Sequence, residues 1–241
     1  MTILRRFGLG LLAGALFLAP AGGCKPPKYV KYASAFGDYT VEVPWGWSVF
    51  MDSSGWDFTN VTFTGPLEPE FYKGIPSLSI RWYALKVPHR LPDGNYEAYR
   101  GTDDFTRQMI RDIYGPGSYT KAGSDREQDV AERDKRALPD QARVKISNWE
   151  GTFYVVYRTL PAPEGESFGV VFSNQDGRKV IRQRHGYVLL PMDGGFYVLT
   201  YPATREGFEK WREAFNHMVK TFHAFKDGPN GPPIDYSKKP S

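Results

Sequence analysis

The sequence contains very little cysteine and histidine and no long apolar run, and each shortage excludes a class of protein. Its 241 residues include one cysteine, Cys24, and four histidines. A single cysteine cannot form a disulfide within its own chain, so the stability of the chain does not depend on disulfides. The apolar run Phe7–Leu18 has 12 residues, whereas a membrane-spanning helix needs about 20.

An excess of one charge is also lacking. Lysine and arginine number 31 and aspartate and glutamate 27, which gives a net charge of +4. Removal of residues 1–23 would take away Arg5 and Arg6 and no acid, so the net charge would fall from +4 to +2. So mild a balance does not suggest an obligatory nucleic-acid partner, and we expect none.

The first 24 residues have the three parts of a secretory signal peptide. Arg5 and Arg6 form a basic start, Phe7–Leu18 an apolar centre, and the small residues of "AGG" precede Cys24. This pattern predicts export, with cleavage at or just before Cys24.

Two glycines and a cysteine after such a run resemble the lipobox of bacterial lipoproteins. The resemblance implies that Cys24 becomes the first residue of the mature protein and carries acyl chains, so that membrane lipid is its partner. One chain anchors a protein only marginally, whereas two or three hold it durably. Lys25 stands where aspartate favours retention in the inner membrane of Gram-negative cells, so the resemblance implies the outer membrane, facing the periplasm, in such a cell.

Composition divides the rest of the chain into a tether, one domain and a tail. Residues 24–35 contain prolines and lysines and predict a lipidated, semi-extended tether that reaches about 30 Å. Residues 36–225 hold nearly all the remaining apolar pattern, and aromatic residues at 15% of the chain are sufficient for one core. Residues 226–241 are rich in proline and glycine and predict a disordered tail.

Alternating apolar residues and short turns predict an antiparallel sheet. The predicted strands are 39–43, 46–51, 56–63, 77–87 and 168–173, with hairpins around 148–151 and 192–194. Helices are predicted at 96–114, with Asp93 as cap, and at 205–224, where Phe208, Trp211, Phe215, Met218 and Phe222 form an apolar stripe. Residues 118–140 are charged and predict an exposed excursion with room for a short helix. The fold class is therefore α+β, an antiparallel β-sheet with helices packed on its faces.

Both ends of the predicted domain resemble the PsbP/Mog-type family. The opening "YTVEVPWGWSVF" has a strand, a proline and a Gly-Trp pair that enters the second strand. The closing "GFYVLTYPATREGFEKWREAFNHMVKTF" has a strand with tyrosine and threonine that leads into an aromatic helix. The resemblance spans residues 36–225 and implies a layered α+β sandwich. It also implies a binding or assembly module with no catalytic residues and no cofactor.

Two short motifs offer alternative functions, hydrolysis by a serine nucleophile and calcium binding. The letters "GESFG" around Ser167 match the nucleophile elbow of serine hydrolases, with His185, His217 and His223 downstream, but prolines precede the serine and a predicted strand follows it. Spacings that mimic a calcium loop occur at Asp93, Asn95, Glu97 and Asp104, but Ala98 stands where that loop needs glycine. The histidine spacings indicate no metal site.

A basic stretch provides the remaining candidate site. Arg178, Arg182, Arg184 and His185 fall together on one predicted strand, where Arg182 and Arg184 share a face. Such a stretch could bind phosphate, lipid headgroups or an acidic partner, or it could be a solvated sheet face. The sequence therefore predicts a lipid-anchored binding or assembly module with an envelope protein as partner. A hydrolase that uses Ser167 and a sensor of small ligands or cations are the alternatives.

Overall fold

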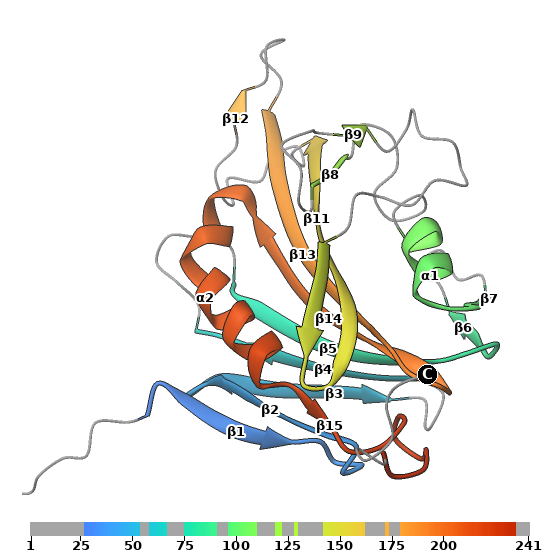
Figure 1. Ribbon diagram of the computed structural model, residues 1–241. Helices are drawn as coiled ribbons and strands as arrows, with labels where there is room; N and C mark the ends of the chain where they lie inside the picture. Colours follow the sequence, from blue (N-terminus) through green and yellow to red (C-terminus); the bar gives the residue numbers. More distant parts are fainter. Residues whose placement is uncertain are drawn as a thin grey trace, which may run out of the picture.

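In the described part of the computed structural model, antiparallel strands form most of the fold and two helices flank them (Figure 1). The structure describes residues 27–53, 58–66, 75–90, 96–109, 119–121, 128–129, 142–161, 172–173 and 179–234. Within these ranges every strand pairing is antiparallel, which confirms the predicted α+β class. None of the helices in these ranges combines the length and apolar character that a bilayer crossing requires.

The larger sheet has ten strands in the described part of the chain. They are β3 (Ser48–Ser53), β4 (Phe58–Thr64), β5 (Ser77–Ala84), β8 (Tyr119–Lys121), β9 (Gln128–Asp129), β10 (Ala142–Ile146), β11 (Trp149–Pro161), β12 (Phe172–Ser173), β13 (Lys179–Pro191) and β14 (Gly195–Thr204). The order is β3-β4-β5-β14-β13-β11-β8-β9, with β10 on β11 and β12 on β13. The hairpin predicted around 192–194 is confirmed as β13–β14. The hairpin predicted around 148–151 is confirmed as β10–β11, but its turn lies at Ser147 and Asn148, because Trp149 already pairs with Ile146.

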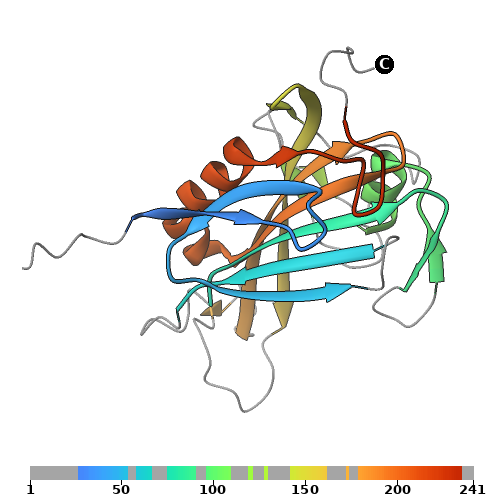
Figure 2. The ribbon, with the colours of Figure 1, turned by 90° about the horizontal axis from the view of Figure 1, so that it is seen from below.

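A smaller sheet consists of β1 (Tyr29–Ala33), β2 (Tyr39–Pro44) and β15 (His223–Ala224), in the order β1-β2-β15. Figure 2 shows β1 and β2 lying across the larger sheet. The prediction of a tether up to residue 35 is therefore wrong for Tyr29–Ala33. Val30 pairs with Val43 in the ladder with β2, and the Tyr32 ring meets Phe63 edge-on at 5.0 Å. These apolar contacts favour a strand despite the lysines around it.

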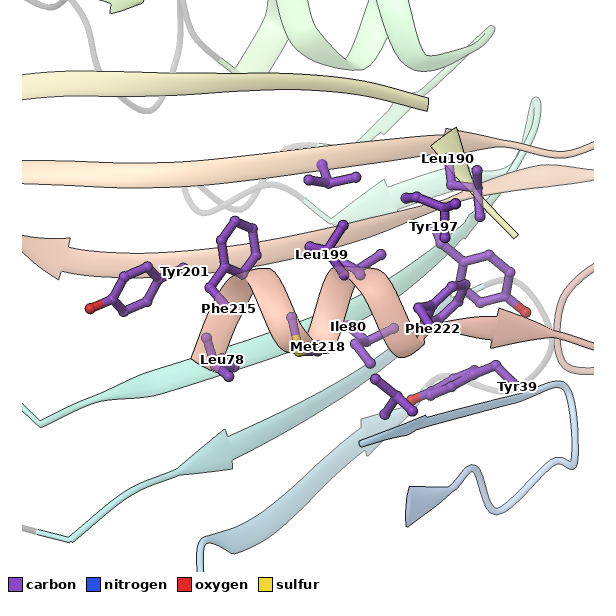
Figure 3. Close-up of a cluster of buried hydrophobic side chains, with 14 of the residues drawn as sticks. Tyr39, Leu78, Ile80, Leu190, Tyr197, Leu199, Tyr201, Phe215, Met218 and Phe222 are labelled. Carbon is purple, nitrogen blue, oxygen red and sulfur yellow. The ribbon is translucent and has the colours of Figure 1, made fainter. Parts of the chain in front are cut away.

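The main core lies between the smaller sheet, one face of the larger sheet and α2 (Arg205–Thr221) (Figure 3). The Thr204 hydroxyl accepts the Gly207 N–H at 3.0 Å and caps the start of the helix. Phe208, Phe215 and Met218 of the predicted stripe are buried. The helix ends at Thr221, three residues earlier than predicted, because His223 and Ala224 turn into an extended pairing with β2.

A second, aromatic core lies on the opposite face of the larger sheet. It includes Tyr83, Tyr99, Phe105, Tyr154, Val156, Tyr187, Leu189, Phe196 and Val198. The helix α1 (Thr102–Met109) covers it, beside a hairpin of β6 (Pro88–Arg90) and β7 (Tyr96–Ala98). The predicted helix 96–114 is thus wrong at its start, because β7 pairs with β6; residues 110–114 and the predicted cap Asp93 lie outside the described residues.

Two further segments are more ordered than their composition predicts. The described part of the predicted tail, residues 226–234, folds back, since Lys226 bridges Pro233 and the Ile234 N–H donates to the Phe225 carbonyl oxygen at 2.8 Å. Within the predicted excursion 118–140, β8 pairs with β11 and β9 pairs with β8. Unpaired strand edges accept such short segments through backbone bonds alone, which composition does not reveal.

A glycine controls the close approach of β14 to β5. A Cβ at Gly195 would overlap the Trp82 ring and the Tyr83 carbonyl oxygen. We expect Gly195→Ala to lower the free energy of unfolding by about 2–3 kcal/mol, because the backbone cannot yield without loss of the β5–β14 ladder. Gly101→Ala is the matched control, since a Cβ there has no atom within 4 Å. Urea denaturation should separate the two variants; equal midpoints would contradict the packing described.

Candidate functional site

The chain enters the fold at a corner between the two sheets. Cys24 lies outside the described residues, which begin at Pro27. The Lys28 carbonyl oxygen accepts the Trp45 N–H at 3.1 Å, where the chain passes from β2 to β3. Gly46 follows with φ +80°, a left-handed conformation that glycine adopts without strain. We call this region, Lys28 with Trp45–Trp47, the entry corner.

Side chains of α2 fix the start of β1 at the entry corner. Lys28 Nζ lies 2.6 Å from Glu213 Oε1, and this bond raises the pKa of the lysine and lowers that of the carboxyl. Both groups are exposed, so the pair adds little stability. The Tyr29 ring stacks on His217 at 3.8 Å, and His217 Nε2 lies 2.8 Å from Glu42 Oε2. The entry point is thus held between β2 and α2.

This attachment shortens the predicted tether. Only four residue steps separate Cys24 from Lys28, which span at most about 14 Å when extended. The sequence predicted a tether of about 30 Å because β1 was read as part of it. A lipid on Cys24 would therefore hold the entry corner close to the bilayer surface.

A buried carboxylate fastens the β1–β2 hairpin to the rest of the fold. Asp38 has no exposed surface; it accepts hydrogen bonds from the Ser34 hydroxyl and, at 2.8 Å, from the Tyr197 hydroxyl. Burial raises the pKa of Tyr197 and of Tyr39, and the nearby Asp38 raises both further. The sequence analysis missed Asp38, because Gly37-Asp38 reads as an ordinary turn and Tyr197 is 159 positions away.

Three residues of the predicted basic site, Arg182, Arg184 and His185, lie on β13, and the two arginines share a face as predicted. Arg184 points toward α2, where its Nη1 lies 2.5 Å from Glu209 Oε1 and its guanidinium carbon 4.0 Å from the centre of the Phe208 ring. Arg182 shares that face by strand alternation and is partly buried. Arg178 lies outside the described residues. The anion or partner site stays a prediction, and the charge of Arg184 is already paired.

His185 lies on the opposite face of β13 from Arg184. Burial, and then the positive charge of Arg158, lower the pKa of His185 from 6.5 to about 4. The imidazole is therefore neutral at neutral pH, so it adds no charge to the basic stretch.

This shift makes stability depend on pH in a defined direction. Between pH 6.5 and 4 the unfolded chain binds a proton at His185 and the folded chain does not, so the free energy of unfolding should fall as the pH is lowered. The expected loss is about 2–3 kcal/mol. Urea denaturation of wild type and His185→Gln at several pH values should show a smaller loss in the variant. Parallel curves for the two proteins would contradict a partly buried imidazole that stays neutral in the folded chain.

The described residues form no catalytic or metal site at the serine-hydrolase motif or at the calcium-like spacing. Ser167 lies outside them, as do Asp93 and Asn95 of the calcium-like spacing. Glu97 falls on β7 and Asp104 on α1, where Asp104 Oδ2 accepts the Arg100 N–H at 3.0 Å. Among the residues that the structure describes, no group of three or more His, Cys, Asp or Glu could hold a metal ion.

Comparisons with known proteins find similar folds at low identity. A scan against protein-family models finds no match, and a search of curated proteins finds none either. A solved structure of the cyanobacterial PsbP protein CyanoP from Synechocystis is 10% identical, covers 86% of this chain and 99% of its own, and has a TM-score of 0.44. LpqN from Mycobacterium tuberculosis, described as involved in cell envelope biogenesis, is 13% identical over 81% of this chain and 90% of its own, with a TM-score of 0.39.

A third similar structure is larger than this chain. A protein from Bacteroides thetaiotaomicron is 12% identical, with a TM-score of 0.40; the match covers 83% of this chain but only 50% of that protein. At these identities and TM-scores the likenesses assign neither a family nor a role.

Proposed function

We propose that the chain is a lipid-anchored binding or assembly module of the bacterial cell envelope. The observation that carries this proposal is the position of Cys24. The cysteine ends a signal-peptide pattern. It stands four residue steps before Lys28, whose carbonyl oxygen accepts a hydrogen bond from Trp45 at the entry corner. A diacylated cysteine at this position would hold the folded domain at a membrane surface without a spanning helix.

Two features support a binding role over catalysis. The sequence ends of the domain resemble the PsbP/Mog-type family, whose members are binding and assembly modules. Two ionisable groups of the described residues are also used within the fold: the buried Asp38 holds the β1–β2 hairpin, and the partly buried Arg184 pairs with Glu209. A partner would be an envelope protein within reach of the membrane surface, and no nucleic acid is expected in that compartment.

Crosslinking in intact cells followed by capture from solubilised membranes tests the binding role. We expect one or a few envelope proteins to be enriched with wild type, relative to an unrelated acylated lipoprotein expressed at the same level. Cys24→Ala should lose this enrichment, because the domain is no longer held at the membrane. Recovery of a discrete small ligand without any protein partner would contradict the proposal and favour the sensor.

A further inference from the structure

The exposed apolar side chains of the described residues are concentrated near the entry corner. Seven large apolar side chains are exposed: Trp45, Val49, Phe50, Met51, Ile75, Tyr96 and Phe225. Four of these lie within residues 45–51. We call Trp45, Val49, Phe50, Met51 and Ile75 the Trp45 face. Its side chains are 47–61% exposed. Val49 and Met51 lie on one side of β3 and Phe50 on the other, because successive side chains of a strand alternate, so the exposed apolar groups lie on both sides of this sheet edge.

Ile75 joins this face through the end of the larger sheet. It precedes Pro76, whose carbonyl oxygen accepts the Gly65 N–H at 2.8 Å, and a Cβ at Gly65 would overlap the Trp47 ring. Ser48 at the start of β3 pairs with Thr64 of β4. The Trp45 face therefore surrounds the first residues of β3, an edge strand of the larger sheet.

We propose that the Trp45 face docks on the lipid surface of the membrane that holds Cys24. This inference rests on the proposed lipid attachment. Lys28 is at most about 14 Å from Cys24, and the Trp45 N–H donates a hydrogen bond to the Lys28 carbonyl oxygen. The headgroup layer is several ångströms thick, so the Trp45 ring lies within reach of it.

The short tether favours lipid over a protein as the occupant of this face. A folded partner of 100 residues has a radius of gyration of about 13 Å, so it could not enter the space between the entry corner and the bilayer. Tryptophan is also enriched at membrane–water interfaces, where its ring meets acyl chains and its N–H meets water. The attached acyl chains raise the local concentration of the lipid surface to the order of millimolar, so that a weak apolar contact suffices.

Charge at the entry corner is compatible with a bilayer. Lys25 lies next to Cys24 in sequence, and Lys28 and Lys31 on the chain that follows are exposed. Glu213 pairs with Lys28 and Glu42 with His217, so these two carboxylates already have a cationic or imidazole partner. Anionic headgroups add a modest attraction to Lys25 and Lys31.

Fluorescence quenching by brominated lipid tests the proposal directly. The acylated protein, purified in detergent from its own membranes, is reconstituted into vesicles of phosphatidylethanolamine and phosphatidylglycerol that contain brominated phosphatidylcholine. We expect tryptophan emission to be quenched, and Trp45→Phe to lose most of that quenching. Trp149→Phe is the matched control, because Trp149 lies at the β10–β11 turn, packed against the core, and not on the Trp45 face; it should retain the quenching.

Two results separate this inference from the proposed function. If mass spectrometry shows acylated Cys24 but Trp45→Phe is quenched as strongly as wild type, the docking proposal is wrong and the anchor stands. If Cys24 carries no lipid, the proposed function fails and the docking proposal falls with it. Photocrosslinking from position 45 to a protein, without lipid adducts, would also overturn the docking proposal.

Discussion

Replacing Cys24 with alanine is expected to abolish incorporation of labelled fatty acid into the protein. The thiol is the atom to which the proposed diacylglycerol is attached, and the chain has no other cysteine. One chain anchors a protein only marginally, whereas the two or three chains on a lipoprotein cysteine hold it durably. The contact of a single exposed tryptophan cannot replace them. Metabolic labelling with an alkyne fatty acid, read by gel fluorescence, measures the loss.

A second thiol serves as the control for position. Ala33 is exposed on β1, so Cys24→Ala combined with Ala33→Cys presents a cysteine nine positions later on the folded domain. We expect no label on this double variant, because acylation depends on the signal-peptide pattern before residue 24. Label on the double variant, or persistent label on Cys24→Ala alone, would show that lipid is attached in some other way.

Asp38→Ala is expected to cause the largest loss of folding stability, about 3–4 kcal/mol. The change leaves the Tyr197 hydroxyl and the Ser34 hydroxyl buried without their acceptor, and each unpaired buried group costs about 1–3 kcal/mol. The cost of burying the carboxylate acts in the opposite direction, but its hydrogen bonds offset that cost in the wild type. The β1–β2 hairpin would lose its hydrogen bond to Tyr197 of β14 and keep the ring contact between Tyr39 and Tyr197.

Asp38→Asn separates the effect of side-chain volume on stability from the effect of the hydrogen bonds that the carboxylate accepts. The amide fills the same volume and can still accept one hydroxyl, so we expect a loss of about 1–2 kcal/mol. Equilibrium urea denaturation gives the free energy of unfolding for both variants, and Tyr197→Phe in the Asp38→Ala background should cost little more. A wild-type midpoint for Asp38→Ala would contradict the role of this buried cluster.

The elements with long, regular patterns were predictable from the sequence. β10 alternates apolar and polar residues, β13 and β14 have apolar runs on either side of Asp193-Gly194, and α2 has an apolar stripe at helical spacing. Their local pattern agrees with their tertiary environment, so the sequence alone identifies them. The fold class followed from these elements.

Short and mixed segments were not predictable, for physical reasons that differ. The lysines near β1 indicated a tether, while Val30 and Tyr32 are only two inward positions, whose burial depends on the distant Phe63. The three residues of β7 are too few to show a period, and their pairing with β6 decides their structure. Tertiary contacts override local preference in both segments.

The candidate site shows the same division. Cys24 was identified from the signal-peptide pattern that precedes it, and this pattern is local in the sequence. The pairing of Arg184 with Glu209 is not local, because the two residues are 25 positions apart on different elements. The Trp45 face required the structure, since exposure of Trp45, Phe50 and Met51 depends on β3 being an edge strand. The sequence predicted a strand over residues 46–51, but nothing in its pattern indicated that its apolar side chains would be exposed.

Mass spectrometry of the amino-terminal peptide, from protein isolated out of its own membranes, tests the lipid anchor most directly. We expect the peptide to begin at Cys24 and to carry the mass of a diacylglyceryl group on sulfur, with or without a further acyl chain on the amino group. A peptide that begins upstream of Cys24, or one that contains an unmodified Cys24 thiol, would contradict the lipid-anchored function.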